Sequence, residues 1–213
     1  MKKSKLLTIV PLLLSFNAFA EKGPYSYLEI DYSSMVFDSP VVSSGVKMES
    51  LNGLEGTGSF QVSKNFALEG GLSVRFDEST GSGIVFETTE SIFYIKPILI
   101  LPVNDILDIN LYGSLGKQKI EVCGSNGFNS VCLDTDIDQK KLGVAFRASV
   151  SDSFEINGDI GRLKLEANNS SATETIKTLG MGYSFTKKQS IQAQVEIDDT
   201  TKTWNVGYRF TFK

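Results

Sequence analysis

The stretch that decides the fold lies near the C-terminus and reads Asn205-Val206-Gly207-Tyr208-Arg209-Phe210-Thr211-Phe212. Its apolar and aromatic residues occupy every second position, with Asn, Gly, Arg and Thr between them. Successive side chains of a β-strand point to opposite faces of a sheet, so this alternation predicts a strand with one apolar and one polar face. The same two-residue period recurs along the rest of the chain.

Nine further segments alternate in this way, which brings the number of predicted strands to ten. They cover residues 25–37, 54–62, 66–76, 85–101, 107–115, 141–150, 154–165, 178–185 and 191–198. No segment has a convincing 3.6-residue period, so the fold class is all-β. After Gly161 the parity of the apolar residues flips to Leu163 and Leu165, which indicates a β-bulge.

The connections alternate between short turns and longer loops. The short ones are 63–65, 102–105, 151–153 and 186–189, and the longer ones are 38–50, 77–82, 119–136 and 166–174. Only the last, 199–201, breaks the trend. Short turns at one end and long loops at the other are typical of an antiparallel up-and-down transmembrane β-barrel with an even number of strands. We predict ten strands, with eight as the alternative.

Residues 1–20 have the features of a secretory signal peptide. Three lysines precede an apolar stretch at 6–16, and the small-x-small sequence Ala18-Phe19-Ala20 follows. An apolar core of about 11 residues is shorter than the roughly 20 that a spanning helix needs. We therefore expect cleavage before Glu21 and a single β-barrel domain over residues 21–213.

The expected mature chain is acidic and enters an oxidising compartment. Without the three lysines of the signal peptide, 18 basic and 25 acidic residues give a net charge of −7. Nucleic acid is therefore a poor partner. We expect Cys123 and Cys132 to form a disulfide that pins a loop rich in Gly, Ser and Asn. Two thiols without His cannot complete a tetrahedral zinc site unless carboxylates join them.

The sequence contains no histidine, so a mechanism that needs an imidazole base is closed to this chain. Asp134, Asp136 and Asp138 form a D-x-D-x-D run that invites a calcium interpretation. An EF-hand loop needs Gly at its sixth position, which is Gln139 here, and Glu at its twelfth, which is Ala145. We interpret the run as a solvated rim and expect no metal site, no cofactor and no enzymatic activity.

The C-terminal stretch resembles the assembly signal of outer-membrane barrels, which reads polar-x-Gly-x-x-aromatic-x-aromatic. The matching residues are Asn205, Gly207, Phe210 and Phe212, and Lys213 departs from the usual ending on the aromatic. Over residues 21–213 the chain is similar to the small outer-membrane β-barrel superfamily, the porin-family type that includes the OmpA-domain, OmpX and Ail-like group. The resemblance implies a bacterial outer-membrane location, insertion by the barrel-assembly machinery, and outer-membrane lipids and lipopolysaccharide as partners. Enzymes of this group use His beside Ser or Asp, so none of their sites can be carried over.

Outward apolar faces would leave the polar faces around the lumen. The charges expected there are the acids Glu29, Asp31, Glu55, Glu69, Asp108, Glu155, Asp159 and Glu196 and the bases Arg75, Lys96, Arg147, Arg162, Lys164 and Arg209. Ten strands enclose little more room than side chains fill, and an unpaired buried charge is costly. We therefore predict a polar network that plugs the lumen, a cation preference for any residual path, and a seam pair between Arg209 and Glu29 or Asp31.

Three functions stay open at the level of sequence. The leading one is an integral outer-membrane barrel with a structural, surface-contact or narrow-pore role. The first alternative is a soluble periplasmic barrel that encloses an apolar ligand. The second is an adhesin that acts through its extracellular loops, with an unidentified surface ligand. The first two differ in whether the apolar face of each strand points out of the barrel or into it.

Overall fold

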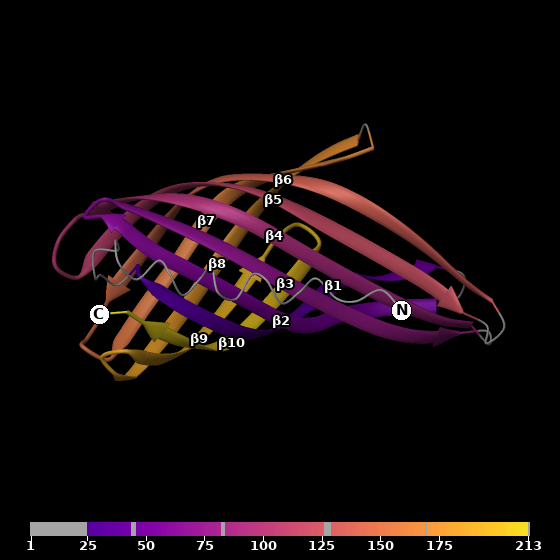
Figure 1. The fold of residues 1–213 in the computed structure, drawn as a ribbon, viewed down its shortest axis with the longest axis horizontal. Coiled ribbons are helices and arrows are strands. Elements are labelled where there is room, and N and C mark those ends of the chain that lie inside the picture. Colours follow the sequence, from indigo (N-terminus) through magenta and orange to yellow (C-terminus); the bar gives the residue numbers. More distant parts are fainter. Residues whose placement is uncertain (1–24, 44–45, 82–83, 126–128, 169, 213) are drawn as a thin grey trace, which may run out of the picture.

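The computed structural model describes residues 25–43, 46–81, 84–125, 129–168 and 170–212. The predicted signal peptide lies outside these residues. The described part of the chain forms ten antiparallel strands that close into a barrel, with strongly tilted strands (Figure 1). It contains no helix that is long and apolar enough to cross a membrane.

The strands follow chain order around the barrel, each pairing with its neighbours in sequence. They are β1 (Tyr27–Ser43), β2 (Val46–Ser63), β3 (Phe66–Gly81), β4 (Ile84–Pro102), β5 (Leu107–Ser125), β6 (Ser130–Ser149), β7 (Phe154–Ala167), β8 (Ser170–Thr186), β9 (Gln189–Ile197) and β10 (Thr201–Thr211). β1 and β10 close the ring, in register from Tyr27 opposite Thr211 to Phe37 opposite Thr201. The prediction of an up-and-down barrel with ten strands is confirmed, and the alternative of eight is wrong.

Most apolar residues of the strands point away from the barrel axis. We call these outward-facing side chains the apolar belt; its most exposed members include Ile30, Leu54, Phe76, Leu115, Leu142 and Tyr183. On β3, Leu72 is 55% exposed while its neighbour Ser73 is 5% exposed and turned inward. A soluble barrel has the opposite arrangement, with its apolar side chains inside. An apolar exterior around a polar interior is the pattern of transmembrane barrels.

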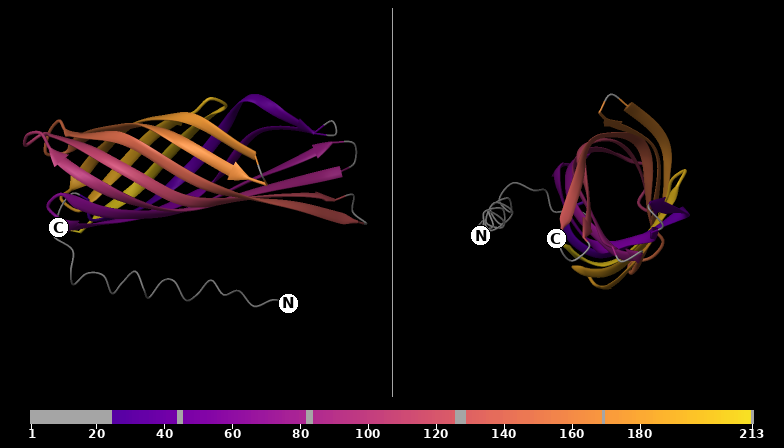
Figure 2. Two further views of the ribbon diagram at one scale, coloured as in Figure 1. Left: turned by 90° about the horizontal axis from the view of Figure 1, so that it is seen from above. Right: turned by 90° about the vertical axis from the view of Figure 1, so that its right-hand side faces the viewer.

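The predicted long loops are mostly strand, so their predicted extent was wrong. Residues 119–125 continue β5, residues 130–136 begin β6, and the β1–β2, β3–β4 and β7–β8 hairpins extend in the same way. Backbone pairing continues beyond the apolar belt, but the parity of the apolar residues changes there. On β5, Ile120 lines the lumen while Lys119 and Glu121 are exposed, so the outward apolar pattern ends before the strand does. The tip of the β7–β8 hairpin diverges from the barrel ring (Figure 2).

The barrel wall is lowest over β9 and β10. These strands have 9 and 11 residues, whereas the others have between 14 and 20. The register of β8 with β9 ends at Lys177 opposite Ile197. Within the described part of the chain, residues 170–176 of β8 therefore pair with β7 alone. In Figure 1 the β9–β10 turn lies well short of the tips of the other hairpins.

The predicted bulge at Gly161 is also wrong. β7 pairs with both neighbours without a register shift, from Phe154 to Ala167. Leu163 and Leu165 line the lumen, so the inner wall itself becomes apolar toward the loop end of β7. Gly161 has a packing reason instead, because a Cβ there would lie 2.8 Å from the Tyr112 hydroxyl oxygen.

Candidate functional site

The lumen holds a cavity of about 630 Å³ to which all ten strands contribute side chains. Its lining includes ten carboxylates and only five basic side chains. The basic ones are Arg75, Lys96, Lys141, Arg147 and Arg209. The ionisable side chains of the lumen are therefore predominantly acidic.

Of the fourteen charges that the sequence assigns to the lumen, eleven line the cavity, and Asp108 bonds to Tyr25 at its short-turn end. The exceptions are Arg162 and Lys164, which are exposed on the outer surface because β7 runs without a bulge and keeps its parity. Four charges were missed: Glu90, Lys141, Glu174 and Asp198 also line the cavity. Each has the same parity as the inward-facing residues of its strand, so parity could have found them once the strand bounds were known. The net acidity of the lumen is consequently larger than predicted.

A tyrosine crosses the short-turn end of the barrel. Tyr25 precedes β1, and its hydroxyl donates to Asp108 Oδ2 (3.0 Å) and accepts from Asn110 Nδ2 (3.0 Å) on β5. β5 is four strands away from β1 in the ten-stranded ring, so these bonds span the lumen. Tyr25 itself is 7% exposed and lies in a cluster with Ala67, Ile98, Ile100 and Tyr112. We call Tyr25 and this cluster the floor.

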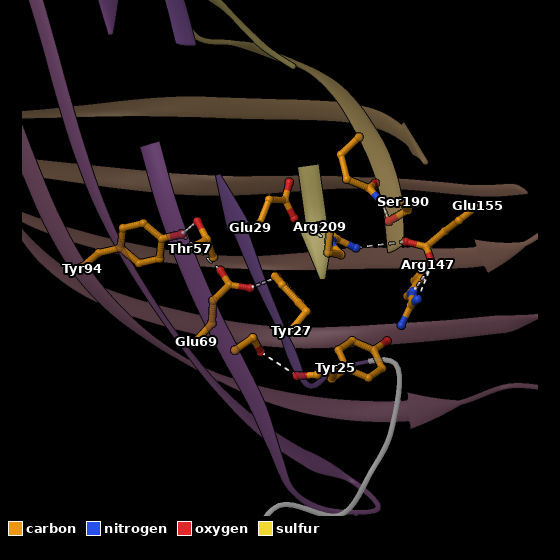
Figure 3. A network of polar contacts seen from close by, with 12 residues as sticks. Tyr25, Tyr27, Glu29, Thr57, Glu69, Tyr94, Arg147, Glu155, Ser190 and Arg209 are labelled. Atoms are coloured by element: carbon orange, nitrogen blue, oxygen red, sulfur yellow. Dashed lines mark hydrogen bonds and ion pairs between the residues drawn. The ribbon is translucent and has the colours of Figure 1, made fainter. Parts of the chain in front are cut away.

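Two arginines and two glutamates form a chain of ion pairs beside the floor (Figure 3). The Arg209 Nε lies 2.5 Å from Glu29 Oε2, and its Nη1 lies 3.6 Å from Glu155 Oε1. Arg147 binds Glu155 from the other side. The guanidinium of Arg209 stacks 4.2 Å from the centre of the Tyr27 ring, and that of Arg147 lies 5.1 Å from the Tyr25 ring. The predicted seam pair is thus present, with Glu29 as the partner of Arg209.

Glu69 on β3 is the centre of a second set of contacts. The Tyr27 hydroxyl donates to its Oε2 at 2.7 Å, while Lys96 Nζ and the Tyr94 hydroxyl reach its Oε1 at 3.0 and 3.3 Å. Figure 3 shows Tyr27 and Tyr94 approaching this carboxylate from different strands. Glu69 is 7% exposed, so these donors replace the water that burial removes.

A third set of contacts lies on the opposite wall. The Tyr112 hydroxyl donates to Asp159 Oδ1 at 2.5 Å, and Lys141 Nζ lies 3.3 Å from the same oxygen and 3.7 Å from Glu196. Lys96 Nζ also lies 4.8 Å from the centre of the Tyr112 ring. Tyrosines therefore connect the ion pairs, a role that charge counting from the sequence could not reveal.

Toward the loop end of the lumen the pairing is sparser. Arg75 Nη1 binds Glu90 Oε2 at 2.8 Å, and its Nη2 lies 3.8 Å from Glu55. Gln118 donates to Glu90 Oε1 at 2.6 Å. Asp31 also lines this region and is 6% exposed. Among the described residues it has no basic side chain within ion-pair distance.

The outer surface above the apolar belt carries salt bridges between neighbouring strands. Hydrogen bonds from Lys140 and Lys164 lower the pKa of Glu166, at the loop end of β7, to about 2. The predicted solvated rim includes Asp134 and Asp138, which pair with Lys119 (3.1 Å) and Lys117 (3.5 Å). Asp136 is likewise exposed. No cluster of three or more potential metal ligands occurs in the described ranges.

The cysteines form the predicted disulfide, but its location differs from the prediction. Cys123 on β5 and Cys132 on β6 lie directly opposite each other in the extended hairpin. The bond therefore ties two paired strands together and not the two ends of a loop.

The residues of the C-terminal pattern occupy both faces of β10. Gly207 lies against Asp31, and a Cβ at this position would be 2.4 Å from the backbone oxygen of Ile30. Phe210 and Phe212 pack edge to face, with ring centres 5.4 Å apart. Asn205 lines the lumen. The pattern thus combines a close strand contact inside with aromatic packing outside.

Closure, strand number and the inverted polarity define the fold of small outer-membrane β-barrels. No family model and no curated protein matches the sequence. Among solved structures, the beta domain of the Bordetella autotransporter BrkA has a TM-score of 0.58 at 10% identity, covering 87% of this chain and 98% of that domain. The outer-membrane protease OmpT of Escherichia coli has a TM-score of 0.56 at 9% identity, covering 88% and 94%. The Ail protein of Yersinia pestis has a TM-score of 0.48 at 16% identity, covering 87% and 97%.

These likenesses concern the fold alone, because every identity is low. They include a protease as well as an autotransporter domain, so they do not assign an activity. What this chain does has to be argued from its own lumen.

Proposed function

We propose that the chain is an integral protein of the bacterial outer membrane whose lumen is a well, closed toward the periplasm and open toward the cell exterior. In this proposal it is neither a diffusion pore nor an enzyme. An even number of antiparallel strands brings the first and last strand ends to the same side of the membrane, the periplasmic side, where the turns are short. That rule places the floor at the periplasmic mouth.

The observation that carries the proposal is the contact of Tyr25 across the lumen. Its hydroxyl bonds to Asp108 and Asn110, and its ring packs on Ile98 and Ile100. Beside it, the pairs of Arg209 and Arg147 with glutamates fill the adjacent cross-section. Buried charges that are paired in this way are costly to separate, so the network opposes an open channel.

The soluble alternative is disfavoured by the apolar belt. Exposed side chains such as Leu142, at 71%, and Leu54, at 61%, would face water on a soluble barrel. Burial of this surface in lipid removes the free-energy cost of exposing apolar side chains to water. Contact with a surface partner stays as a second candidate, favoured by the disulfide-linked β5–β6 hairpin that extends beyond the belt.

Planar-bilayer recording tests the closed floor. The wild-type protein is expected to show no large, stable conductance, and Tyr25→Ala is expected to open a small cation-selective path. Gel migration with and without boiling checks that both proteins are folded, and fractionation with and without detergent checks the membrane location. A large and weakly selective wild-type conductance would overturn the proposal of a closed well.

A further inference from the structure

The outer half of the lumen has a lining that a purely polar plug does not explain. Six apolar side chains from six different strands surround it, and we call them the upper ring. They are Met35, Leu51, Ile92, Ile120, Leu163 and Ile176. The interior of a transmembrane barrel is usually polar. Contact between these apolar side chains and an apolar group of a ligand would remove both surfaces from water, which lowers the free energy of the complex.

Carboxylates lie next to the upper ring in direct strand register. Asp31 is opposite Glu55, Glu55 is opposite Ser73, and Ser73 is opposite Ile92. All four side chains line the cavity. Side chains in register on neighbouring strands have Cβ atoms about 5 Å apart, and like charges placed so are destabilising. A cation bound at Asp31 and Glu55 would relieve this repulsion.

The basic side chains of this region are already engaged. Arg75 is 2.8 Å from Glu90 but 3.8 Å from Glu55, so its shorter ion pair is with Glu90. Lys141 is 3.3 Å from Asp159 and 3.7 Å from Glu196. The outer half of the lumen therefore keeps an excess of negative charge.

An unsatisfied hydroxyl marks the same place. Ser73 is 5% exposed, and its Oγ has no hydrogen-bond partner. Buried polar atoms are almost always paired in native proteins, so a free buried acceptor at a cavity wall points to a donor supplied by a ligand. The donor would lie between Glu55 and Ile92, the register neighbours of Ser73.

We propose that this site binds a primary ammonium group attached to an apolar substituent. The ammonium donates to Glu55, Asp31 and the Ser73 hydroxyl, and the substituent lies against the upper ring. A primary ammonium has three N–H donors, which matches two carboxylates and one hydroxyl. The proposal rests on the lumen being open to the exterior, and it adds the chemical class of the ligand.

Calorimetric titration of the full barrel in lipid nanodiscs tests the site with 2-phenylethylammonium as the probe. Three matched probes separate the contributions: 3-phenylpropanoate has the opposite charge, 2-phenylethanol has none, and ethylammonium lacks the ring. We expect saturable binding of 2-phenylethylammonium and at least tenfold weaker binding of each of the others. Empty nanodiscs correct for partition into lipid.

Two variants and one control locate the binding. Glu55→Gln and Ser73→Ala are each expected to weaken binding of 2-phenylethylammonium, the first by at least tenfold. Ser73→Ala removes a hydroxyl without a partner, so it keeps the fold even if Glu55→Gln leaves Arg75 poorly paired. Glu78→Gln, an exposed carboxylate on the extended part of β3, should leave the affinity unchanged.

The outcomes separate this site from the closed floor. Equal binding of the anionic probe, no binding at all, or binding insensitive to both variants would overturn the site. Amine binding in a barrel that conducts freely would overturn the floor and support the site. A barrel that does not conduct and does not bind the amine would leave the floor standing and refute the site.

Discussion

Removal of Arg209 should destabilise the barrel by leaving two carboxylates without their shared base. Its guanidinium lies 2.5 Å from Glu29 and 3.6 Å from Glu155, and the three side chains are only 15%, 11% and 16% exposed. Breaking a buried ion pair by removing one partner costs about 3–5 kcal/mol. Arg209→Met keeps most of the apolar stem, so the loss is mainly electrostatic. We expect a destabilisation in the lower part of that range, because Arg147 still pairs with Glu155.

Urea unfolding from lipid vesicles measures this free energy. The single tryptophan, Trp204, faces outward and reports the loss of its lipid surroundings by fluorescence. Arg162→Met is the matched control, since Arg162 is exposed and its contact is with Thr175 at 3.4 Å. Exposed substitutions of this kind change stability by about 0.5 kcal/mol or less.

A double-mutant cycle decides whether the cost is the ion pair. Removing both charges with Arg209→Met and Glu29→Gln should cost at least about 1 kcal/mol less than the sum of the single changes, because neither leaves the other unpaired. Strict additivity, or an Arg209→Met variant within about 1 kcal/mol of wild type, would refute the argument that the lumen network holds buried charge.

Three further predictions address the exterior, the seam and the disulfide. Leu72→Arg, in the apolar belt, should destabilise the barrel in vesicles by about 2–4 kcal/mol, whereas Thr80→Arg on the extended hairpin should not; equal effects on urea unfolding would argue against a lipid-facing belt. Gly207→Ala should cost about 1–3 kcal/mol by crowding at the seam, while Gly56→Ala, with no atom within 4 Å of the added Cβ, should be neutral in the same assay. Reduction of Cys123–Cys132 should release about 2–3 kcal/mol at most, confined to the hairpin; hydrogen exchange should rise in β5 and β6 near the tip, and unfolding of the whole barrel on reduction would contradict this.

The sequence predicted the strands within the apolar belt well, because lipid on one side and a polar lumen on the other impose a strict two-residue period. It failed where one of those environments ends. Beyond the belt the apolar residues of β5 change face: Ile120 lines the lumen while Lys119 and Glu121 are exposed, so the strand continues with the opposite parity. On β7 the inner wall becomes apolar, so Leu163 and Leu165 mimic a bulge that is absent.

The charged side chains of the lumen could be assigned from parity, but their partners could not. Glu69 on β3 contacts Tyr27 on β1 and both Tyr94 and Lys96 on β4. Which side chains meet in this way depends on the register and tilt of the strands. Tyr25 belongs to the first alternating segment, 25–37, but it precedes β1 in the structure, and its partners on β5 follow only from closure of the barrel. The floor is therefore a property of the three-dimensional closure, whereas the acidic lumen was visible in the sequence.

In the proposed well, the short strands β9 and β10 would leave an entrance at the side of the barrel. Trp204 points outward three residues into β10, and aromatic residues of transmembrane barrels lie at the level of the lipid headgroups. A molecule at that depth would reach the upper ring sideways, over the β9–β10 turn, without first leaving the leaflet. For an amine with an apolar tail, the rate of entry would then follow its concentration in the leaflet, whereas its occupancy at equilibrium does not depend on the route. Lengthening the tail should therefore raise the rate of association through partitioning into the leaflet.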